Sequence, residues 1–320
     1  MLVFVIRRLL IAFPVLVGVT AITYLIISLA PGDPVTAMLD PEQMTVLGPD
    51  WVRQRKAELG LDKPVPVRYL LWLTQLAQGN LGYSAIDRLP VARKIAERFW
   101  PTLKLMLAAM LIALMVGIPV GILSAVKQYS LLDYAATMLG LVMISVPSFF
   151  LALAGIYLLS VRLHWLPTAG MMTIGAPPSF MDDLQHLVLP ATALGLAQAA
   201  PLIRYARASM LEVIRKDYVR MARAKGLVEY RVILRHALPN ALIPIITVVA
   251  LHLPALVGGT IIIEQIFAWP GMGTLAITAI NGRDYPVIMA FNLVAAIAIV
   301  GSSLIADLAY AAVDPRIRYR

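Results

Sequence analysis

Residues 218–242 read YVRMARAKGLVEYRVILRHALPNAL and form the centre of a basic segment that separates two strongly apolar stretches. The whole segment, residues 204–239, contains nine Lys or Arg residues and three acids, a net charge of plus six. A basic connection between two membrane-spanning helices lies on the cytoplasmic side by the positive-inside rule. The segment therefore predicts which side of a membrane this connection faces, provided that the flanking stretches span one.

The composition of the chain supports the interpretation that the flanking stretches span a membrane. Of 320 residues, 60% are hydrophobic and 14% are charged, and the mean hydropathy is +0.81, outside the usual range of soluble domains. A helix needs about 20 apolar residues to cross a ~30 Å hydrocarbon layer. We therefore predict an all-α polytopic membrane protein with six transmembrane helices, of which the fourth is the weakest. The charge-free windows are residues 9–30, 105–126, 134–161, 187–203, 241–263 and 285–306.

The positions of the basic residues predict the orientation. Fifteen of them fall on one side of the six spans: two before the first span, Lys127, the nine of the basic segment, and three at the C-terminus. The long connection after the first span also has nine, but long loops are translocated largely regardless of charge. We therefore expect both termini to be cytoplasmic.

This topology divides the chain into four parts. We expect a first transmembrane helix at residues 1–30, an extracytoplasmic segment with short helices at 31–99, a five-helix core at 100–313 and a cytoplasmic tail at 314–320. The core contains the basic cytoplasmic loop, residues 207–240.

A cleaved signal sequence is the alternative for the N-terminus. Arg7 and Arg8 precede an apolar run that ends in Ser28-Leu29-Ala30, which resembles a secretory or twin-arginine signal with a small-residue cleavage site. The 22-residue run is longer than the usual signal core of about 7 to 15 residues. This length favours a retained membrane anchor.

Several functional classes are disfavoured. The net charge of +9 and pI of 9.8 come from residues that flank spans, so we expect membrane lipid and no nucleic acid as a partner. Without cysteine, the chain has no thiolate catalysis and no Cys-ligated metal, and its four histidines lack ligand spacing. No phosphate-binding Gly-rich loop or hydrolase motif is present. We expect no catalytic residues, no metal site and no cofactor in this chain.

The outer segment and the spans contain further local signals. We predict a charged helix at residues 49–59, a helix that starts near Pro66 and ends at Gly79, and an interfacial amphipathic helix at 90–100 whose apolar face includes Val91, Ile95 and Phe99. Prolines such as Pro147 predict kinks. Four ionisable residues near span ends are expected to form structural ion pairs or to snorkel: Lys104, Arg204, Glu264 and Asp307.

The basic loop itself predicts two short helices joined at an angle. Apolar residues recur at helical spacing from Ala208 to Lys225, and Gly226 suits the left-handed position that ends a helix. A second helix is expected from Val228 to about Leu238, where Pro239 should break the chain before the fifth span. Small residues at 222 and 224 would keep this elbow slim enough to be gripped by another protein. The alternative is an ordinary positive-inside loop.

The spacing within the elbow resembles a known signature. Gly226, nine residues, His236, one residue and Leu238-Pro239 are similar to the EAA loop of bacterial ABC importer permeases: Glu-Ala-Ala, three residues, Gly, nine, Ile, one, Leu-Pro. Here Arg220-Met221-Ala222 replaces Glu-Ala-Ala and His236 replaces Ile. The arginine is typical of the peptide-importer branch.

Other motifs extend the resemblance to the dipeptide and oligopeptide (peptide/nickel) permease family, first-permease-subunit type, over nearly the whole chain. They are IRRLL (6–10), LAPGDP (29–34), LGLDKP (59–64), GNLG (79–82), PTL (101–103), DYVR (217–220), ARAKGL (222–227), FAWPGMG (267–273), RDYPV (283–287) and DPRIRY (314–319).

The resemblance implies an ABC importer type I permease fold in the bacterial inner membrane. The implied partners are a homologous second permease, two cytoplasmic ATPase subunits that use ATP and Mg²⁺, and an extracytoplasmic substrate-binding protein. It also implies that the elbow docks on an ATPase subunit and transmits its closure. The candidate ATPase-coupling residues are Arg220, Met221, Ala222, Arg223, Ala224, Lys225, Gly226, Leu238 and Pro239.

The cargo implied by the resemblance is a di- or oligopeptide. The alternatives are nickel chelates, glutathione or another small solute in the same family, and the substrate-binding residues are unknown. A secondary transporter is less consistent with the sequence, because no repeated half and little midplane charge are visible.

Overall fold

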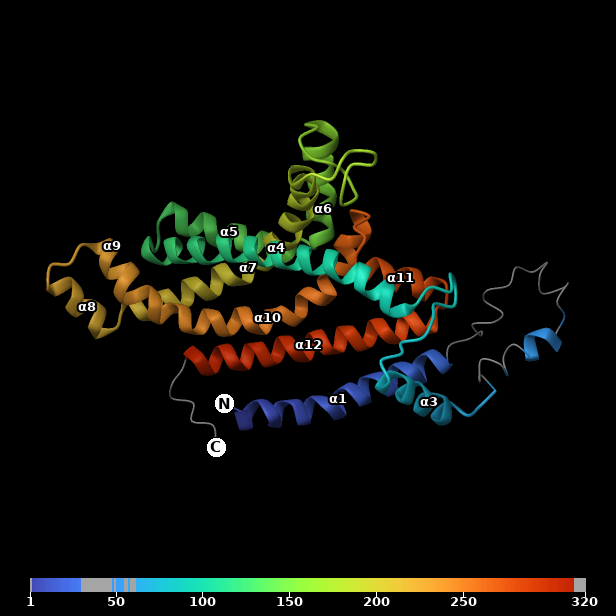
Figure 1. Ribbon diagram of the computed structural model, residues 1–320. Coiled ribbons are helices and arrows are strands. Elements are labelled where there is room, and N and C mark those ends of the chain that lie inside the picture. Colours follow the sequence, from blue (N-terminus) through green and yellow to red (C-terminus); the bar gives the residue numbers. More distant parts are fainter. Residues whose placement is uncertain (1, 30–47, 49, 55–56, 58–61, 314–320) are drawn as a thin grey trace. The chain divides into compact units, whose positions relative to one another are not determined.

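The computed structural model describes residues 2–29, 48, 50–54, 57 and 62–313 (Figure 1). This part is helical, with one isolated β-bridge between Tyr83 and Pro90 and no strand. Of the predicted 49–59 helix, residues 50–54 and 57 are described and are helical. Residues 30–34 of the LAPGDP motif and the predicted tail at 314–320 lie outside the described residues. The chain divides into a first unit, Met1–Pro101 with Gly271–Val300, and a second unit, Thr102–Pro270 with Gly301–Arg320.

The described helices include several that could cross a membrane. Four contain sufficiently long apolar stretches: α1 (Leu2–Leu29), α4 (Val91–Val126), α7 (Phe180–Ile214) and α12 (Tyr285–Val313). A further pair of helices, bent relative to each other, brings the number of candidate spans to five if the pair is counted as one span. In addition, α10 (Leu238–Ile266) has 29 residues, about 43 Å at 1.5 Å per residue. The all-α membrane fold is confirmed, and the count of six spans stays a prediction.

The predicted third span is not one continuous helix. It consists of α5 (Leu131–Ser145), α6 (Ser148–Gly155) and the π-helical turn η2 (Ile156–Arg162), with a bend of 101° between α5 and α6. The α-helical hydrogen bonds of α5 end with Val146 N–H donating to the Val142 carbonyl at 2.9 Å. Pro147 then has no N–H to continue the helix, so the chain restarts as α6. The kink at Pro147 is confirmed, and the helix predicted at 134–161 is broken there.

Helix α7 has a central place in the second unit, where it packs against α5, α6 and α10 (Figure 1). Its contact with α4 is close because the facing residues are small. A Cβ at Gly121 would lie 2.6 Å from the Ile203 carbonyl oxygen, and one at Gly117 would lie 2.7 Å from the Leu202 Cβ. These two glycines therefore set how near α4 approaches α7. The main core cluster contains Leu105, Ala109, Leu189, Leu194, Ile263, Phe267 and Trp269.

In the first unit, α3 (Val65–Ala77) packs against α1. The Thr20 and Tyr69 hydroxyls lie 2.9 Å apart, and Tyr69 also donates to the Val17 carbonyl at 3.0 Å. Helix α3 has proline in its first turn and ends before Gly79, which confirms both predicted boundaries.

The predicted interfacial helix at 90–100 is instead the first part of α4, which is unbroken from Val91 to Val126. Its apolar face does not lie free: Val91 and Ile95 are buried in a cluster with α11 (Met272–Asn281) and the start of α12. Protein packing, rather than a membrane surface, therefore covers Val91 and Ile95. Phe99 remains exposed.

The ionisable residues near span ends differ among themselves. Lys104 Nζ donates to Asp183 at 2.8 Å, which confirms a structural ion pair. Glu264 does not snorkel: it is fully buried, and the Thr102 hydroxyl donates to its carboxylate at 2.6 Å.

Candidate functional site

The basic segment forms a compact elbow, residues 215–237, between α7 and α10. Helix α7 ends at Ile214, Lys216 adopts an extended conformation, and α8 (Asp217–Ala224) begins after it. The prediction of one helix from Ala208 to Lys225 is therefore wrong. The helical periodicity of the sequence continues across the interruption, because both α7 and α8 turn their apolar residues toward the same core.

The glycine at the end of α8 has the predicted role. Gly226 has a φ of +75°, in the left-handed region, and its N–H donates to the Arg223 carbonyl at 2.9 Å. A Cβ at this position would meet no atom within 4 Å. Glycine is therefore favoured here by backbone conformation and not by crowding.

The second half of the elbow departs from the prediction. It contains a short α9 (Glu229–Arg231) and a π-helical turn, η3 (Val232–Ala237), which leads directly into α10. Pro239 lies in the first turn of α10 and does not break the chain. A first-turn N–H has no intrahelical acceptor, so proline is tolerated there.

A small apolar core holds the elbow together. Val219 and Ala222 of α8 are buried against Val232 and Ala237 of η3, and the same cluster includes Met210 and Val213 of α7, Ala241 of α10 and Ala125 of α4. The elbow is therefore continuous with the ends of three long helices. Ala222 faces this core rather than the outside.

The outer surface of the elbow combines apolar and cationic side chains. Met221 is 58% exposed and Tyr230 60%. The other exposed candidates are Arg220, Arg223, Ala224, Lys225 and Gly226 at the end of α8, with Leu227, Val228, Arg231, Leu234 and Arg235 beyond them. Such a surface suits a partner with an apolar cleft bordered by acidic groups. Of the remaining candidates, Leu238 is half-buried and Pro239 exposed at the start of α10.

One ion pair closes the elbow across its tip. The Arg223 guanidinium donates to Glu229 through Nε at 3.1 Å and Nη2 at 2.7 Å. These bonds hold the pKa of Glu229 below its ordinary value, against a smaller opposing effect of desolvation. The same contact raises the pKa of Arg223. At neutral pH both groups are charged, and the pair links the end of α8 to the start of α9.

The comparison with known families decides the class of protein. The family described as binding-protein-dependent transport system inner membrane component matches residues 117–319, and its N-terminal region matches residues 1–106. The chain belongs to this family. It is a membrane-spanning permease component of a binding-protein-dependent ABC importer of the inner-membrane type, and it is not an enzyme.

Individual relatives match the permease over its full length. It is 46% identical over 99% of both chains to a Brucella suis biovar 1 (strain 1330) protein named as a peptide permease. It is 43% identical over 99% of both chains to the oligopeptide transport system permease protein AppB of Bacillus subtilis (strain 168). The glutathione transport system permease protein GsiC of Salmonella choleraesuis (strain SC-B67) is 39% identical over 100% of both chains.

A solved structure confirms the fold of the permease. A chain of the inward-facing MetNI methionine ABC transporter aligns with a TM-score of 0.57 at 19% identity, covering 69% of this chain and 96% of that one. The predicted ABC importer permease fold is therefore correct.

The sequence interpretation missed two polar clusters in the permease. In the second unit, Asp133 binds Arg207, and Ser124 donates to the same carboxylate. A signal was present: Ser130 and Asp133 have the Ser-x-x-Asp spacing of a helix start. The Ser130 hydroxyl does accept from Asp133 N–H at 3.3 Å.

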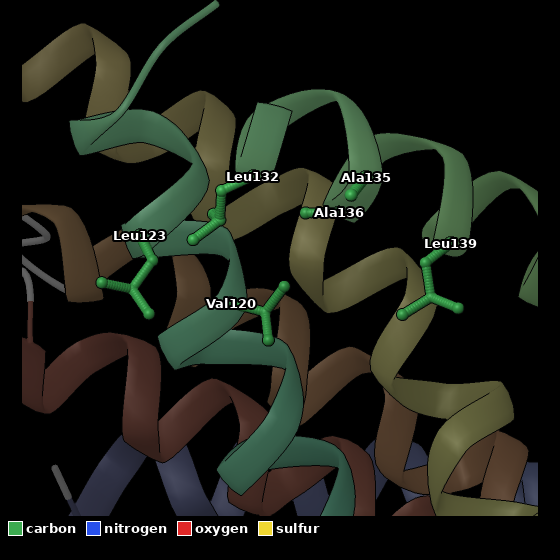
Figure 2. A pocket seen from close by; sticks show the side chains of 6 residues that line it. All are labelled: Val120, Leu123, Leu132, Ala135, Ala136 and Leu139. Atoms are coloured by element: carbon green, nitrogen blue, oxygen red, sulfur yellow. The ribbon is translucent and has the colours of Figure 1, made fainter. Parts of the chain in front are cut away.

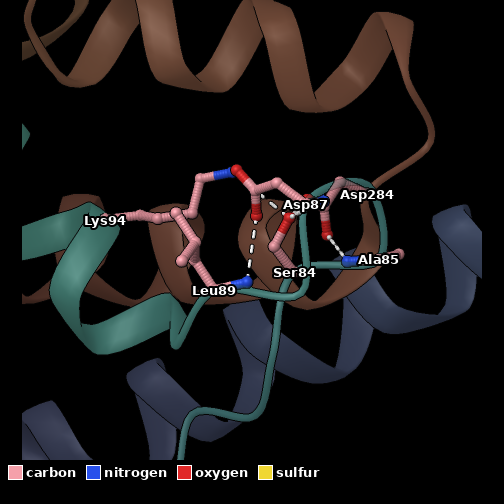
Figure 3. Close-up of polar contacts among 6 residues, drawn as sticks. All are labelled: Ser84, Ala85, Asp87, Leu89, Lys94 and Asp284. Atoms are coloured by element: carbon pink, nitrogen blue, oxygen red, sulfur yellow. Dashed lines mark hydrogen bonds and ion pairs between the residues drawn. The ribbon is translucent and has the colours of Figure 1, made fainter.

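The second cluster lies in the first unit and is shown in Figure 3. Asp284 and Ser84 are both buried, and the Ser84 hydroxyl donates to Asp284 at 2.5 Å, as does Ala85 N–H at 3.0 Å. Lys94 Nζ donates to Asp87 at 2.6 Å, which lowers the pKa of that carboxyl. These contacts hold residues 82–90, the outer loop, against the turn between α11 and α12.

Proposed function

We propose that this permease forms half of the translocation pathway of an ATP-driven importer for di- or oligopeptides. The other half is a homologous second permease. Two cytoplasmic ATPase subunits bind ATP and Mg²⁺, and an extracytoplasmic binding protein delivers the substrate. Residues 31–99 are the extracytoplasmic segment, and both termini and the elbow are cytoplasmic. The chain itself needs no cofactor.

The observation that carries this proposal is the construction of the elbow. Its core is shared with α7, α4 and α10, while its outer face presents Met221 and Tyr230 among arginines. A partner that grips the outer face would move the core and hence the ends of those helices. Because packed protein interiors are nearly incompressible, the displacement is passed on rather than absorbed. Closure of the ATPase pair would in this way switch the pathway between outward and inward access.

The substrate class is supported by the relatives' names. Two of the reported relatives are named for peptides or oligopeptides at 46% and 43% identity. Glutathione, itself a small peptide, is the second candidate because of the relative at 39% identity. Nickel chelates are a further alternative within the family. Direct binding of dipeptides, oligopeptides and glutathione to the cognate binding protein would separate these candidates.

Cross-linking tests the coupling role of the elbow. The permease has no cysteine, so Met221→Cys introduces a single thiol on the exposed face. In the assembled importer, a short bifunctional thiol-to-amine reagent is expected to join this residue to an ATPase subunit. Tyr129→Cys is the matched control, because Tyr129 is 72% exposed in the connection between α4 and α5.

Function is measured on the same complexes. Met221→Glu places an acid on the gripped face and is expected to reduce uptake and substrate-stimulated ATP hydrolysis at least tenfold, about 1.4 kcal/mol of coupling. An intact complex in which Met221→Cys gives no cross-link to an ATPase subunit, or no more than Tyr129→Cys, would contradict the proposal.

A further inference from the structure

An ion pair between buried Asp133 and partly buried Arg207 joins the first turn of α5 to α7. Asp133 is 2% exposed. Arg207 donates to it through Nε at 2.7 Å and through Nη2 at 2.9 Å. A fork of two parallel bonds fixes the relative orientation of the two groups as well as their separation. The pair therefore constrains how α5 is set against α7.

The same carboxylate is bound from α4 and from the connection after it. The fully buried Ser124 hydroxyl of α4 donates to one oxygen, and Tyr129 N–H donates to the other at 3.0 Å. A buried ion pair with satisfied hydrogen bonds adds little net stability over apolar packing, so a role in fixing one arrangement is the more informative hypothesis.

Beyond this polar contact, α5 meets α4 across a groove. The groove has a volume of about 250 Å³ and runs between the two helices (Figure 2). It is lined by Val120, Leu123, Leu132, Ala135, Ala136 and Leu139. On its other side α5 packs on α7, where a Cβ at Gly140 would lie 3.8 Å from the Ala200 carbonyl oxygen. With open space toward α4, the orientation of α5 depends on its packing against α7 and on the ion pair at its end.

Arg207 lies on α7, and the last turns of this helix pack against the elbow. Helix α7 is unbroken from Arg207 to Ile214, and its Met210 and Val213 lie in the core of the elbow with Val219. A displacement of the elbow therefore carries Arg207 with it.

We propose that the Asp133–Arg207 pair is the joint through which movement of the elbow is passed to α5, and so to the break at Pro147, in each transport cycle. Both are positioning residues. The inference rests on the proposed function, because it requires the ATPase subunits to move the elbow.

Distance measurements on the complete importer test this joint. Nitroxide labels are placed at Met138→Cys on α5 and Tyr205→Cys on α7, both exposed positions, with the cysteines of the partner subunits replaced. The label distance is measured before and after trapping with ATP, Mg²⁺ and orthovanadate. In the parent chain we expect no change, since α5 follows α7. With Asp133→Asn, or with Arg207→Lys, which keeps the charge without the fork, we expect trapping to shift the distance by about 3 Å or more, more than half the 5.4 Å rise of one helical turn.

A second ion pair in the same unit is the matched control. Asp183→Asn removes the partner of Lys104 and is expected to leave the distance unchanged by trapping, as in the parent. A constant distance in both joint variants overturns the inference, and so does an equal shift in the Asp183→Asn control. The Met221→Cys cross-link, measured in each background, separates the two proposals: its absence in the parent chain contradicts the coupling role itself. If the cross-link persists while the joint variants show no shift, only the joint is wrong.

Discussion

Met221 and Ala222 are neighbours in sequence with opposite surroundings. The first is exposed on the outer face of the elbow, and the second is buried against η3. A charge introduced at Ala222 would therefore disrupt the elbow from inside, and loss of transport would not report on a partner contact. From the sequence, the small residue at 222 is explained by a slim elbow. Periodicity alone cannot show that the following segment folds back over α8 and buries this residue.

The Arg223–Glu229 pair predicts a pH dependence of the elbow. The folded-state pKa of Glu229 is depressed, so its stabilising contribution is complete above the ordinary Glu pKa of about 4.3 and is lost as the pH falls through the lower folded value. At pH 7, Glu229→Gln should increase amide hydrogen exchange in α8 by up to about fivefold, the upper range for partly exposed pairs.

The variant and the parent are compared at each pH, because exchange itself depends on pH. Their difference should vanish at acidic pH. Glu212→Gln removes a more exposed partner, that of Lys216, and should have a smaller effect. A difference between Glu229→Gln and the parent that stays constant down to pH 3 would contradict the assignment.

At the scale of elements, the outer loop is supported by hydrogen bonds from Ser84 and Ala85 to the buried Asp284. Its Tyr83, Ile86 and Leu89 are exposed, whereas Ser84 between them is buried against Asp284. Exposed apolar side chains on a rigid polar support are typical of a binding surface. We expect this loop, within the proposed extracytoplasmic segment, to contact the binding protein.

Single substitutions test this contact without removing Ser84 from its buried position. Tyr83→Ser should raise the concentration of binding protein that gives half-maximal ATPase stimulation by about tenfold, the effect of ~1.4 kcal/mol. Leu70→Ser, at a similarly exposed apolar position on α3, is the control. An unchanged concentration dependence for Tyr83→Ser, with normal assembly, would show that the loop does not dock the partner.

Prolines illustrate what the sequence can predict about elements. Pro147 ends α5 with a 101° bend, whereas α7 runs on through Pro190 and Pro201 and Pro239 sits harmlessly in a first turn. Whether a helix continues past a proline depends on which carbonyl group the absent N–H would have bonded to, and on which side chains pack around that position. Local sequence identifies a proline as a candidate break, and tertiary packing decides the outcome.

At the scale of the whole molecule, the apolar windows predict the fold class and five of the helical regions well, because chain length and hydropathy determine them. The candidate site is predicted in composition and in the position of Gly226. The interior of the site is not predicted, since the residues that form it come from α4, α7, α8, η3 and α10. The Asp133–Arg207 contact joins residues 74 positions apart, a separation that no local pattern reveals.

The predicted orientation of the permease can be tested directly. Helix α4 has 36 residues, about 54 Å at 1.5 Å per residue, so residues beyond its two ends should lie on opposite sides of the membrane. In intact cells, an impermeant maleimide should label Tyr83→Cys and spare Tyr129→Cys, and in inverted vesicles the pattern should reverse. Labelling of Tyr129→Cys from outside would place the elbow on the wrong side for an ATPase partner.

The bond between Ser84 and Asp284 spans 200 residues of sequence, and this imposes an order on biosynthesis. A ribosome adding roughly 5 to 20 residues per second needs about 10 to 40 s to go from one partner to the other. During that interval the outer loop has been made but lacks the carboxylate that holds it. A truncated permease that ends before Asp284 would therefore leave the outer loop without the carboxylate that binds Ser84.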